Sequence, residues 1–190
     1  QMPITFYKDL KITTGPKVYK PAEDSFLLAN NLEVDKDEKV LEIGTGSGLI
    51  SILAAKKEAT VVATDILDNA LDCAKENSKR EGVDGKIDFR KGSMFEPVKN
   101  EKFDLIVFNP PYLPVSSEER MDTDLEKAWD GGEDGRETID LFLEEVTERL
   151  KPGGRFMFVQ SSLSGTEETL ERLKEMDIQF EAKTEKLSFE

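Results

Sequence analysis

Apolar residues along the chain fall into two kinds of segment: short continuous runs, and longer stretches in which they recur every three or four positions. The short runs are typical of strands buried on both faces of a sheet, and the longer stretches are typical of amphipathic helices. The runs predict strands at 39–44, 60–65, 86–92, 103–109 and 155–161. Helical spacing predicts helices at 48–57, 67–82, 138–150 and 165–176. Strands that alternate with helices indicate βαβ units and a mostly parallel sheet.

The end of the chain departs from this alternation. Two strands joined only by a short turn would place an antiparallel strand at one edge of the sheet. The candidate segment is "IQFEAKTEKLSFE" (178–190), and we expect its strand to be cut short at Glu190. No repeat, low-complexity tract or Gly/Ser-rich linker interrupts the chain, so residues 1–190 are expected to form a single domain.

Composition narrows the possible classes of function. A chain of 190 residues with 37% hydrophobic and 35% charged residues suits one soluble globular domain with a sizeable core. No run of about 18 apolar residues is present, and the N-terminus lacks the apolar core of a signal peptide. The chain has one cysteine, Cys73, and no histidine, which excludes a disulfide framework, a Cys/His zinc site and a histidine-dependent triad within it. We interpret Cys73 as a packing residue and expect a cytoplasmic protein.

The net charge of −14 disfavours tight binding to a nucleic-acid backbone. The acid is concentrated at residues 118–149, which hold 13 Asp and Glu against four Lys and Arg, a net charge of −9. Such a run is usually a solvated helix face. The alternative is a surface that meets a basic protein partner.

A glycine-rich turn lies in "LEIGTGSG" (41–48), between a predicted strand and a predicted helix, and contains Gly44, Gly46 and Gly48. Glycines at such a turn allow the backbone to approach a ligand closely. The spacing is G-x-G-x-G rather than the dinucleotide-binding G-x-G-x-x-G, and Glu42 just before the turn would repel a phosphate. We therefore expect a cofactor with a cationic end and no phosphates.

The second predicted strand ends in Asp65, 17 residues after Gly48. A carboxylate at the tip of that strand can accept hydrogen bonds from both hydroxyls of a ribose. A ribose site beside a site for a cationic amino-acid tail indicates S-adenosylmethionine. The alternative is a generic βαβ turn in which Asp65 caps the following helix.

The fourth predicted strand lies in "FDLIVFNPPYLPV" (103–115) and is followed by Asn109, Pro110, Pro111 and Tyr112. Open α/β sheets bind ligands at this end of their strands. The prolines fix φ and remove two N–H donors, so the loop presents carbonyl acceptors beside the Asn109 amide oxygen. Two rigid acceptors suit an NH₂ group, and Tyr112 offers a flat face to a planar group. The alternative is a strand that ends in a proline-rich turn, with Tyr112 in the core.

Four segments together resemble the HemK family of class I S-adenosylmethionine-dependent methyltransferases: "VYKPAEDSFLL" (18–28), "LEIGTGSGLIS" (41–51), "FNPPYLP" (108–114) and "WDGGEDGRETIDLFL" (129–143). The chain is most similar to the short branch of that family, which modifies class I translation termination factors in archaea and eukaryotes. The resemblance covers nearly the whole chain and implies a three-layer, Rossmann-like α/β class I methyltransferase fold. Its mostly parallel sheet would have seven strands, with an antiparallel edge strand.

The resemblance also implies roles for residues outside these strand ends. An N-terminal segment, about residues 1–35, would cover the cofactor, with Ser25 as a contact. The alternative is an N-terminal helix packed by Phe26, Leu27 and Leu28, and the two interpretations are compatible. The family usually places an Asp after the third strand to contact the adenine amino group, where this chain has Ser93, so the backbone of Met94 is a further candidate contact. The expected cofactor site comprises these residues together with Glu42, Gly44, Gly46, Gly48, Asp65 and Asn109.

The implied partners are a class I release factor, as substrate, and a small zinc-binding activator protein that forms a heterodimer near the third strand. The three glycines of "WDGGEDG" (129–135) predict a mobile loop near the substrate opening, with Trp129 as an anchor; the alternative is a surface turn buried against the sheet. Neither a membrane nor a nucleic acid is expected as a partner.

The expected reaction is methylation of the glutamine amide in the Gly-Gly-Gln loop of that release factor, and three other functions stay open. Nucleic-acid adenine-N6 methylation could use the same Asn-Pro-Pro-Tyr, although the chain has no basic stripe. Protein lysine methylation would need a base to deprotonate the ammonium, and no obvious base is present. A cofactor-binding scaffold without catalysis is opposed by the intact Asn109 and Tyr112.

Overall fold

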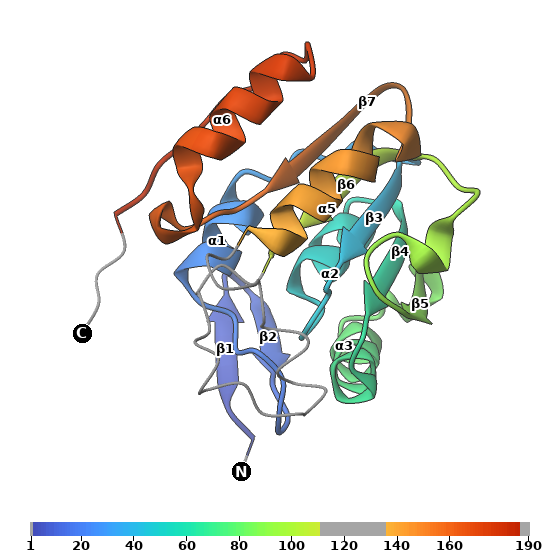
Figure 1. Cartoon of the computed structure of the whole chain (residues 1–190). Helices are drawn as coiled ribbons and strands as arrows, with labels where there is room; N and C mark the ends of the chain where they lie inside the picture. The colour runs from blue at the N-terminus through green and yellow to red at the C-terminus, as the bar shows by residue number, and fades with distance from the viewer. Residues whose placement is uncertain (1, 111–135, 187–190) are drawn as a thin grey trace.

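The computed structural model describes residues 2–110 and 136–186 and has a five-stranded sheet at its centre (Figure 1). Its strands are Lys39–Ile43 (β3), Thr60–Asp65 (β4), Ile87–Lys91 (β5), Phe103–Phe108 (β6) and Leu150–Phe158 (β7). The order across the sheet is β5-β4-β3-β6-β7, and each neighbouring pair is parallel. All five strands predicted from apolar runs are therefore present, and they form the predicted parallel sheet.

The sheet differs from the expected seven strands with an antiparallel edge. Within the described part of the chain it has five strands, and no antiparallel strand joins it. Residues 177–186 form no strand, and residues 187–190 lie outside the described ranges. A strand exists only when a neighbour satisfies its backbone hydrogen bonds, so an apolar pattern alone does not predict whether a terminal segment is paired.

Helices cover both faces of the sheet (Figure 1), which makes the three layers that were expected. Helices α1 (Glu23–Asn30) and α2 (Leu49–Lys56) pack on one face, and α5 (Glu137–Glu145) packs on the other. Adjacent strand residues point to opposite faces: Val40 packs toward α1 and α2, whereas Leu41 packs toward α5. Helix α3 (Asp68–Arg80) contacts β4 and β5, and α6 (Thr166–Glu175) joins the α5 side. The central side chain on that side is the fully buried Phe142, whose ring lies 4.9–5.8 Å from the rings of Phe95, Phe108, Phe156 and Phe158.

The helix predicted at 138–150 ends earlier than its apolar spacing indicates. Helix α5 ends at Glu145, a 3₁₀ turn (Val146–Arg149) follows, and β7 begins at Leu150. The "KPGG" segment is an irregularity within β7, because Leu150 pairs with Phe103 and pairing resumes between Arg155 and Leu105. Pairing with β6 thus overrides the local helical pattern.

An N-terminal hairpin that the apolar pattern did not predict precedes α1. Strands β1 (Ile4–Tyr7) and β2 (Leu10–Thr13) pair in antiparallel fashion. In β1 the apolar Ile4 and Phe6 are exposed, so the strand has no simple inward-apolar alternation by which it could be recognised. Strand β2 does bury Leu10 and Ile12 in the main core.

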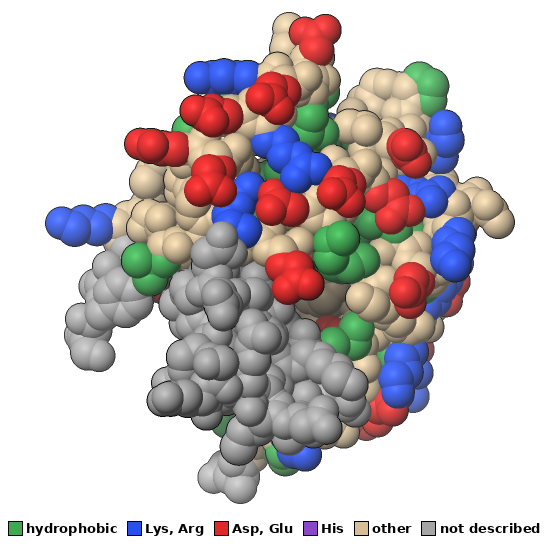
Figure 2. Space-filling view, viewed as in Figure 1, with side chains coloured by type: hydrophobic (Ala, Val, Ile, Leu, Met, Phe, Trp, Pro, Cys, Tyr) green, Lys and Arg blue, Asp and Glu red, His purple; other side chains and the backbone are tan. Residues whose placement is uncertain are grey.

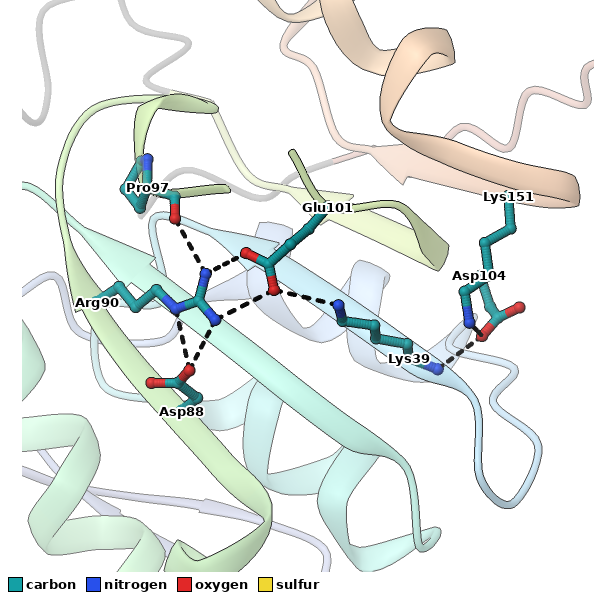
Figure 3. Close-up of polar contacts among 7 residues, drawn as sticks. All are labelled: Lys39, Asp88, Arg90, Pro97, Glu101, Asp104 and Lys151. Atoms are coloured by element: carbon teal, nitrogen blue, oxygen red, sulfur yellow. Dashed lines mark hydrogen bonds and ion pairs between the residues drawn. The ribbon is translucent and has the colours of Figure 1, made fainter. Parts of the chain in front are cut away.

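Charged side chains connect four of the five sheet strands (Figure 3). Arg90 on β5 binds Glu101, which also accepts a hydrogen bond from Lys39 Nζ on β3 at 3.2 Å. Asp104 on β6 accepts hydrogen bonds from the Lys39 backbone N at 2.7 Å and from Lys151 Nζ on β7 at 3.2 Å. The hydrogen bond from Arg90 is the main cause that lowers the pKa of Glu101. The members are partly exposed, so a single ion pair among them would add little stability. Several pairs joined in one network stabilise the sheet more than any single pair would.

In the described part of the acidic segment, several carboxylates pair with arginine. Asp140 on α5 accepts hydrogen bonds from Arg136 at 2.8 Å and from Arg172 at 3.0 Å, and Glu145 accepts one from Arg149 at 2.7 Å. Figure 2 shows acidic and basic side chains interleaved over this face. This is the arrangement of a solvated helix face; residues 118–135 lie outside the described ranges. Among the helices that the structure describes, none is both long enough and apolar enough to cross a membrane.

Candidate active site

The sheet reverses its order of connection between β3 and β6. From β3 the chain continues to β4 and β5 on one side, and it then returns to β6 and β7 on the other. Ligands of open α/β sheets bind at the carboxyl ends of the strands at such a point. Glu42 lies near the end of β3, Asp65 ends β4, and Asn109 follows β6. The structure therefore brings these three predicted site residues to one edge of the sheet.

The glycine-rich turn follows β3, and its glycines have two different roles. All three have positive φ: +73° at Gly44, +55° at Gly46 and +92° at Gly48. A side chain at Gly48 would place its Cβ 3.0 Å from the Cβ of Ala74, so this glycine allows α2 and α3 to pack closely. A Cβ at Gly44 or Gly46 would meet no atom within 4 Å. The first two glycines therefore leave open space beside the backbone of the turn, as a bound ligand requires.

Glu42 is a buried carboxylate at the base of this turn, with 5% of its surface exposed. Its Oε1 accepts hydrogen bonds from the hydroxyls of Thr45 and Ser51, each at 2.7 Å, and from the Ser51 backbone N at 3.2 Å. Burial nevertheless dominates and raises the pKa of Glu42 to about 7. A buried carboxylate of this kind is stabilised in its charged form when a cation binds beside it.

Asp65 links the end of β4 to the glycine-rich turn. Its Oδ2 accepts a hydrogen bond from the Gly46 backbone N, and its Oδ1 accepts one from the Leu67 backbone N, both at 3.0 Å. Burial is the main cause that raises the pKa of Asp65. Each carboxylate oxygen can accept a second hydrogen bond, so these backbone contacts leave capacity for two ligand hydroxyls.

The remaining predicted cofactor contacts lie on two separate segments. Ser25 is buried on α1, where its Oγ accepts a hydrogen bond at 3.4 Å from the backbone of the preceding turn. The loop after β5 approaches the end of β4, because the Gly92 backbone N donates to the Asp65 carbonyl oxygen at 3.0 Å. In that loop Ser93 is exposed, whereas Met94 packs its side chain against the core. Ser93 can therefore offer its hydroxyl to a ligand, and Met94 only its backbone.

Asn109 points its side chain toward the N-terminal helix. Its Nδ2 donates a hydrogen bond to Oδ2 of Asp24 at 3.1 Å. Its Oδ1 is buried and accepts no hydrogen bond within the part of the chain that is described. A buried amide oxygen without a partner is costly, which makes it a ready acceptor for a ligand N–H. Pro110 is buried, and the other predicted residues of this loop, Pro111, Tyr112 and Trp129, lie outside the described ranges.

Asp24 was missed by sequence reasoning. It is 4% exposed and also accepts a hydrogen bond from the Tyr19 hydroxyl, 3.0 Å from Oδ1. The only signal in the sequence was its place in the "PAED" segment, next to Ser25. Nothing local indicates that its partner is an amide 85 positions away.

Comparison with known proteins identifies the family. The model of the methyltransferase small domain matches residues 10–126. A protein of Methanocaldococcus jannaschii named as a protein N5-glutamine methyltransferase is 49% identical over 90% of this chain and 86% of the relative. A release factor glutamine methyltransferase of Aquifex aeolicus is 37% identical over 76% of this chain and 54% of its own length.

Solved structures show the same fold. A methyltransferase from Pyrococcus furiosus superposes with a TM-score of 0.68 at 24% identity, over 93% of this chain and 85% of that one. The family model covers more than half of the chain, and the archaeal relative matches nine tenths of it. The chain therefore belongs to the methyltransferase small domain family and to its HemK group of S-adenosylmethionine-dependent methyltransferases.

Proposed function

We propose that this enzyme methylates the side-chain amide nitrogen of the glutamine in the Gly-Gly-Gln motif of a class I release factor. The observation that carries the proposal is the buried Oδ1 of Asn109, which accepts no hydrogen bond from the described residues and lies at the ligand-binding edge of the sheet. The names of the relatives agree with this substrate: the archaeal one refers to N5-glutamine and the Aquifex one to release factor glutamine.

The chemistry of an amide explains why two acceptors are needed. An amide nitrogen is a poor nucleophile because its lone pair is delocalised into the carbonyl group. In the proposed site, Asn109 Oδ1 and the Pro110 carbonyl oxygen each accept one N–H and hold the nitrogen in line for attack. The same acceptors favour rehybridisation of the nitrogen and stabilise the positive charge that develops on it. No general base has to act before transfer, in agreement with a chain that has no histidine.

The methyl donor is S-adenosylmethionine, and the described residues fit it. When bound, it supplies an electrophilic methyl group on a sulfonium. We assign Glu42 to the cationic amino-acid end, because this buried carboxylate lies beside the open space at Gly44 and Gly46. We assign Asp65 to the ribose hydroxyls, because both of its oxygens retain a lone pair. The remaining contacts are assigned to Ser25, to the Ser93 hydroxyl and to the Met94 backbone.

We further propose that a small zinc-binding activator protein adds a strand to the outer edge of β5. This strand pairs only with β4 in the described sheet, so its other edge is available for main-chain hydrogen bonds. Asp88 and Lys91 are exposed there and Phe89 is partly exposed, so main-chain pairing would contribute more than apolar contact. The zinc of this proposal is the partner's own; within residues 2–110 and 136–186 no group of three or more His, Cys, Asp or Glu side chains could hold a metal ion. The proposed compartment is the cytoplasm.

The decisive experiment uses labelled S-adenosylmethionine and four substrates: a recombinant release factor, its Gln→Ala loop variant, single-stranded DNA and duplex DNA. Each reaction is run with and without the candidate zinc-binding protein. Label on the wild-type factor alone supports the proposal. Label on DNA supports adenine methylation instead, which the same pair of acceptors could direct. Label that persists on the Gln→Ala factor would indicate another side chain, such as lysine.

A further inference from the structure

We propose that Asp24 is a positioning residue that fixes the orientation of the Asn109 amide and so makes the site selective for an NH₂ group. This inference rests on the proposed function and deepens it. Asp24 lies on α1, whereas Asn109 follows β6, and a hydrogen bond of 3.1 Å joins Asp24 Oδ2 to Asn109 Nδ2. The N-terminal segment would then do more than cover the cofactor, because it would set the polarity of the group that meets the substrate.

The need for such a residue follows from the symmetry of an amide. Rotating the Asn109 amide by half a turn exchanges its oxygen and its NH₂ with little change in shape. An ionised carboxylate only accepts hydrogen bonds, so Asp24 can pair with the NH₂ end and not with the oxygen. Oδ1 is then directed away from Asp24, where it is buried and accepts no hydrogen bond from a described residue. In the reversed orientation the site would present two donors, which would repel the N–H groups of a substrate amide.

A second hydrogen bond holds the carboxylate itself. The Tyr19 hydroxyl donates a hydrogen bond to Asp24 Oδ1 at 3.0 Å, while Asp24 Oδ2 accepts the hydrogen bond from Asn109 Nδ2. The two donors use different oxygens, so the carboxylate plane is fixed by contacts at both ends. Asp24 is only 4% exposed, so water does not compete strongly for these oxygens.

The same arrangement predicts how the site rejects glutamate. A glutamate side chain in place of glutamine would bring a carboxylate toward the Asn109 oxygen, with the Asp24 charge behind it. Acceptor would meet acceptor, and the buried Oδ1 would stay without a donor. Selectivity for glutamine over glutamate should therefore depend on Asp24, although Asp24 does not contact the substrate.

The test compares wild type with Asp24→Ala and Asp24→Asn, and uses Glu33→Ala as the control. Glu33 is an exposed carboxylate just after α1, so its removal changes the charge by the same amount. For Asp24→Ala we expect kcat to fall roughly 10- to 100-fold, as for loss of a hydrogen bond to a charged group. The control variant Glu33→Ala should have the same cofactor affinity and the same thermal midpoint of unfolding as wild type. Asp24→Asn keeps the shape but lets the Asn109 amide reverse, so its kcat should also fall.

A second measurement separates orientation from a merely structural role. Binding of the release factor is compared with binding of its Gln→Glu variant, which cannot be methylated at the amide. Wild type should prefer the glutamine form, and Asp24→Asn should lose most of that preference because a reversed amide donates to a carboxylate. If Asp24→Ala does not fold, the isosteric Asp24→Asn decides the question.

Two outcomes would overturn the inference: wild-type kcat in a folded Asp24 variant, or an unchanged glutamine preference in Asp24→Asn. If wild type methylates no glutamine substrate, the proposed function fails, but the orientation is still measurable. The side-chain NH₂ resonances of Asn109, assigned by their loss in Asn109→Ala, should shift in Asp24→Asn and stay in place in Glu33→Ala. If the Asn109 side-chain resonances do not shift in Asp24→Asn, the positioning role is refuted, whatever the substrate is.

Discussion

The side chain of Asn77 pairs with the backbone of Thr13 as a neighbouring strand would. Its Oδ1 lies 3.1 Å from the Thr13 backbone N, and its Nδ2 lies 2.9 Å from the Thr13 carbonyl oxygen. The same Nδ2 donates to the Ser47 carbonyl oxygen in the glycine-rich turn at 2.8 Å. The Cys73 thiol also donates to the Thr13 carbonyl oxygen, at 3.0 Å. The fully buried Asn77 therefore ties the N-terminal hairpin to the cofactor end of the sheet.

Replacing Asn77 by Ala should lower the free energy of unfolding by about 2–4 kcal/mol, because the buried Thr13 backbone N and the Ser47 carbonyl oxygen would lose their hydrogen bonds to Asn77. The measurement is urea unfolding, together with limited proteolysis of the N-terminal hairpin. Asn69→Ala is the matched control, because Asn69 is an exposed asparagine on the same helix. Equal stability of the two variants would show that the hydrogen bonds of Asn77 contribute nothing to the free energy of unfolding.

Replacing Asn109 by Ala should remove most turnover and leave cofactor affinity nearly intact. The buried Oδ1 is assigned to the substrate nitrogen, so its loss acts on the reacting group, and we expect kcat to fall about 100- to 1,000-fold. Single-turnover methylation and calorimetric titration with S-adenosylmethionine measure the two quantities separately. Full activity in this variant would mean that the proposed amide clamp is wrong.

Replacing Asp65 by Ala should weaken cofactor affinity by roughly 10- to 100-fold, the range for hydrogen bonds to a charged group. Asp68→Ala is the control, because this exposed carboxylate lies three positions away and pairs with Lys91 at 2.8 Å. Calorimetry on both variants checks the assignment. Unchanged affinity in Asp65→Ala would exclude the ribose role. Asp65 would then only hold the turn in place through its hydrogen bonds with the Gly46 and Leu67 backbone.

The raised pKa of Glu42 predicts that stability decreases with pH in a defined window. Burial raises this pKa from 4.5 to about 7, so between these values the folded state keeps a proton that the unfolded state has lost. The free energy of unfolding should therefore fall as pH rises from 4.5 to about 7, with a slope of up to about 1.4 kcal/mol per pH unit. Glu42→Gln should reduce that slope. Unfolding curves that keep the same pH dependence in both proteins would show that Glu42 does not titrate there.

The same group predicts that cofactor binding depends on pH. A cation binds to the charged carboxylate, so below pH 7 the free enzyme must release a proton before it binds S-adenosylmethionine. Affinity should fall by up to about tenfold for each pH unit below 7. Titrations in buffers of different ionisation enthalpy should show the proton release. In Glu42→Gln, cofactor affinity should be low and nearly independent of pH across this range. A wild-type affinity that does not change from pH 5.5 to 8 would contradict the assignment of Glu42 to the cationic end of the cofactor.

Local patterns were sufficient for the five described strands and for several residues of the candidate site. Strands buried on both faces require continuous apolar runs, so β3 and β6 were visible without any knowledge of their neighbours. A turn between strand and helix that must approach a ligand requires glycine, which made Gly44 and Gly46 recognisable. Parallel strands end at the same edge, so the sequence alone implied that Asp65 and Asn109 would lie at one edge of the sheet.

Features that depend on contacts between distant segments were decided only by the tertiary structure. Pairing with β6 starts β7 at Leu150 and shortens the preceding helix, although the local apolar spacing continues. The N-terminal hairpin is held by Asn77, which no periodicity reveals. The partner of Asp24 lies 85 positions away, and whether a carboxylate meets an amide or water is a property of packing. The sequence by itself therefore determined the central strands and the polar groups at their ends, because these follow from local patterns. The fold decided which distant groups meet there and how they are oriented.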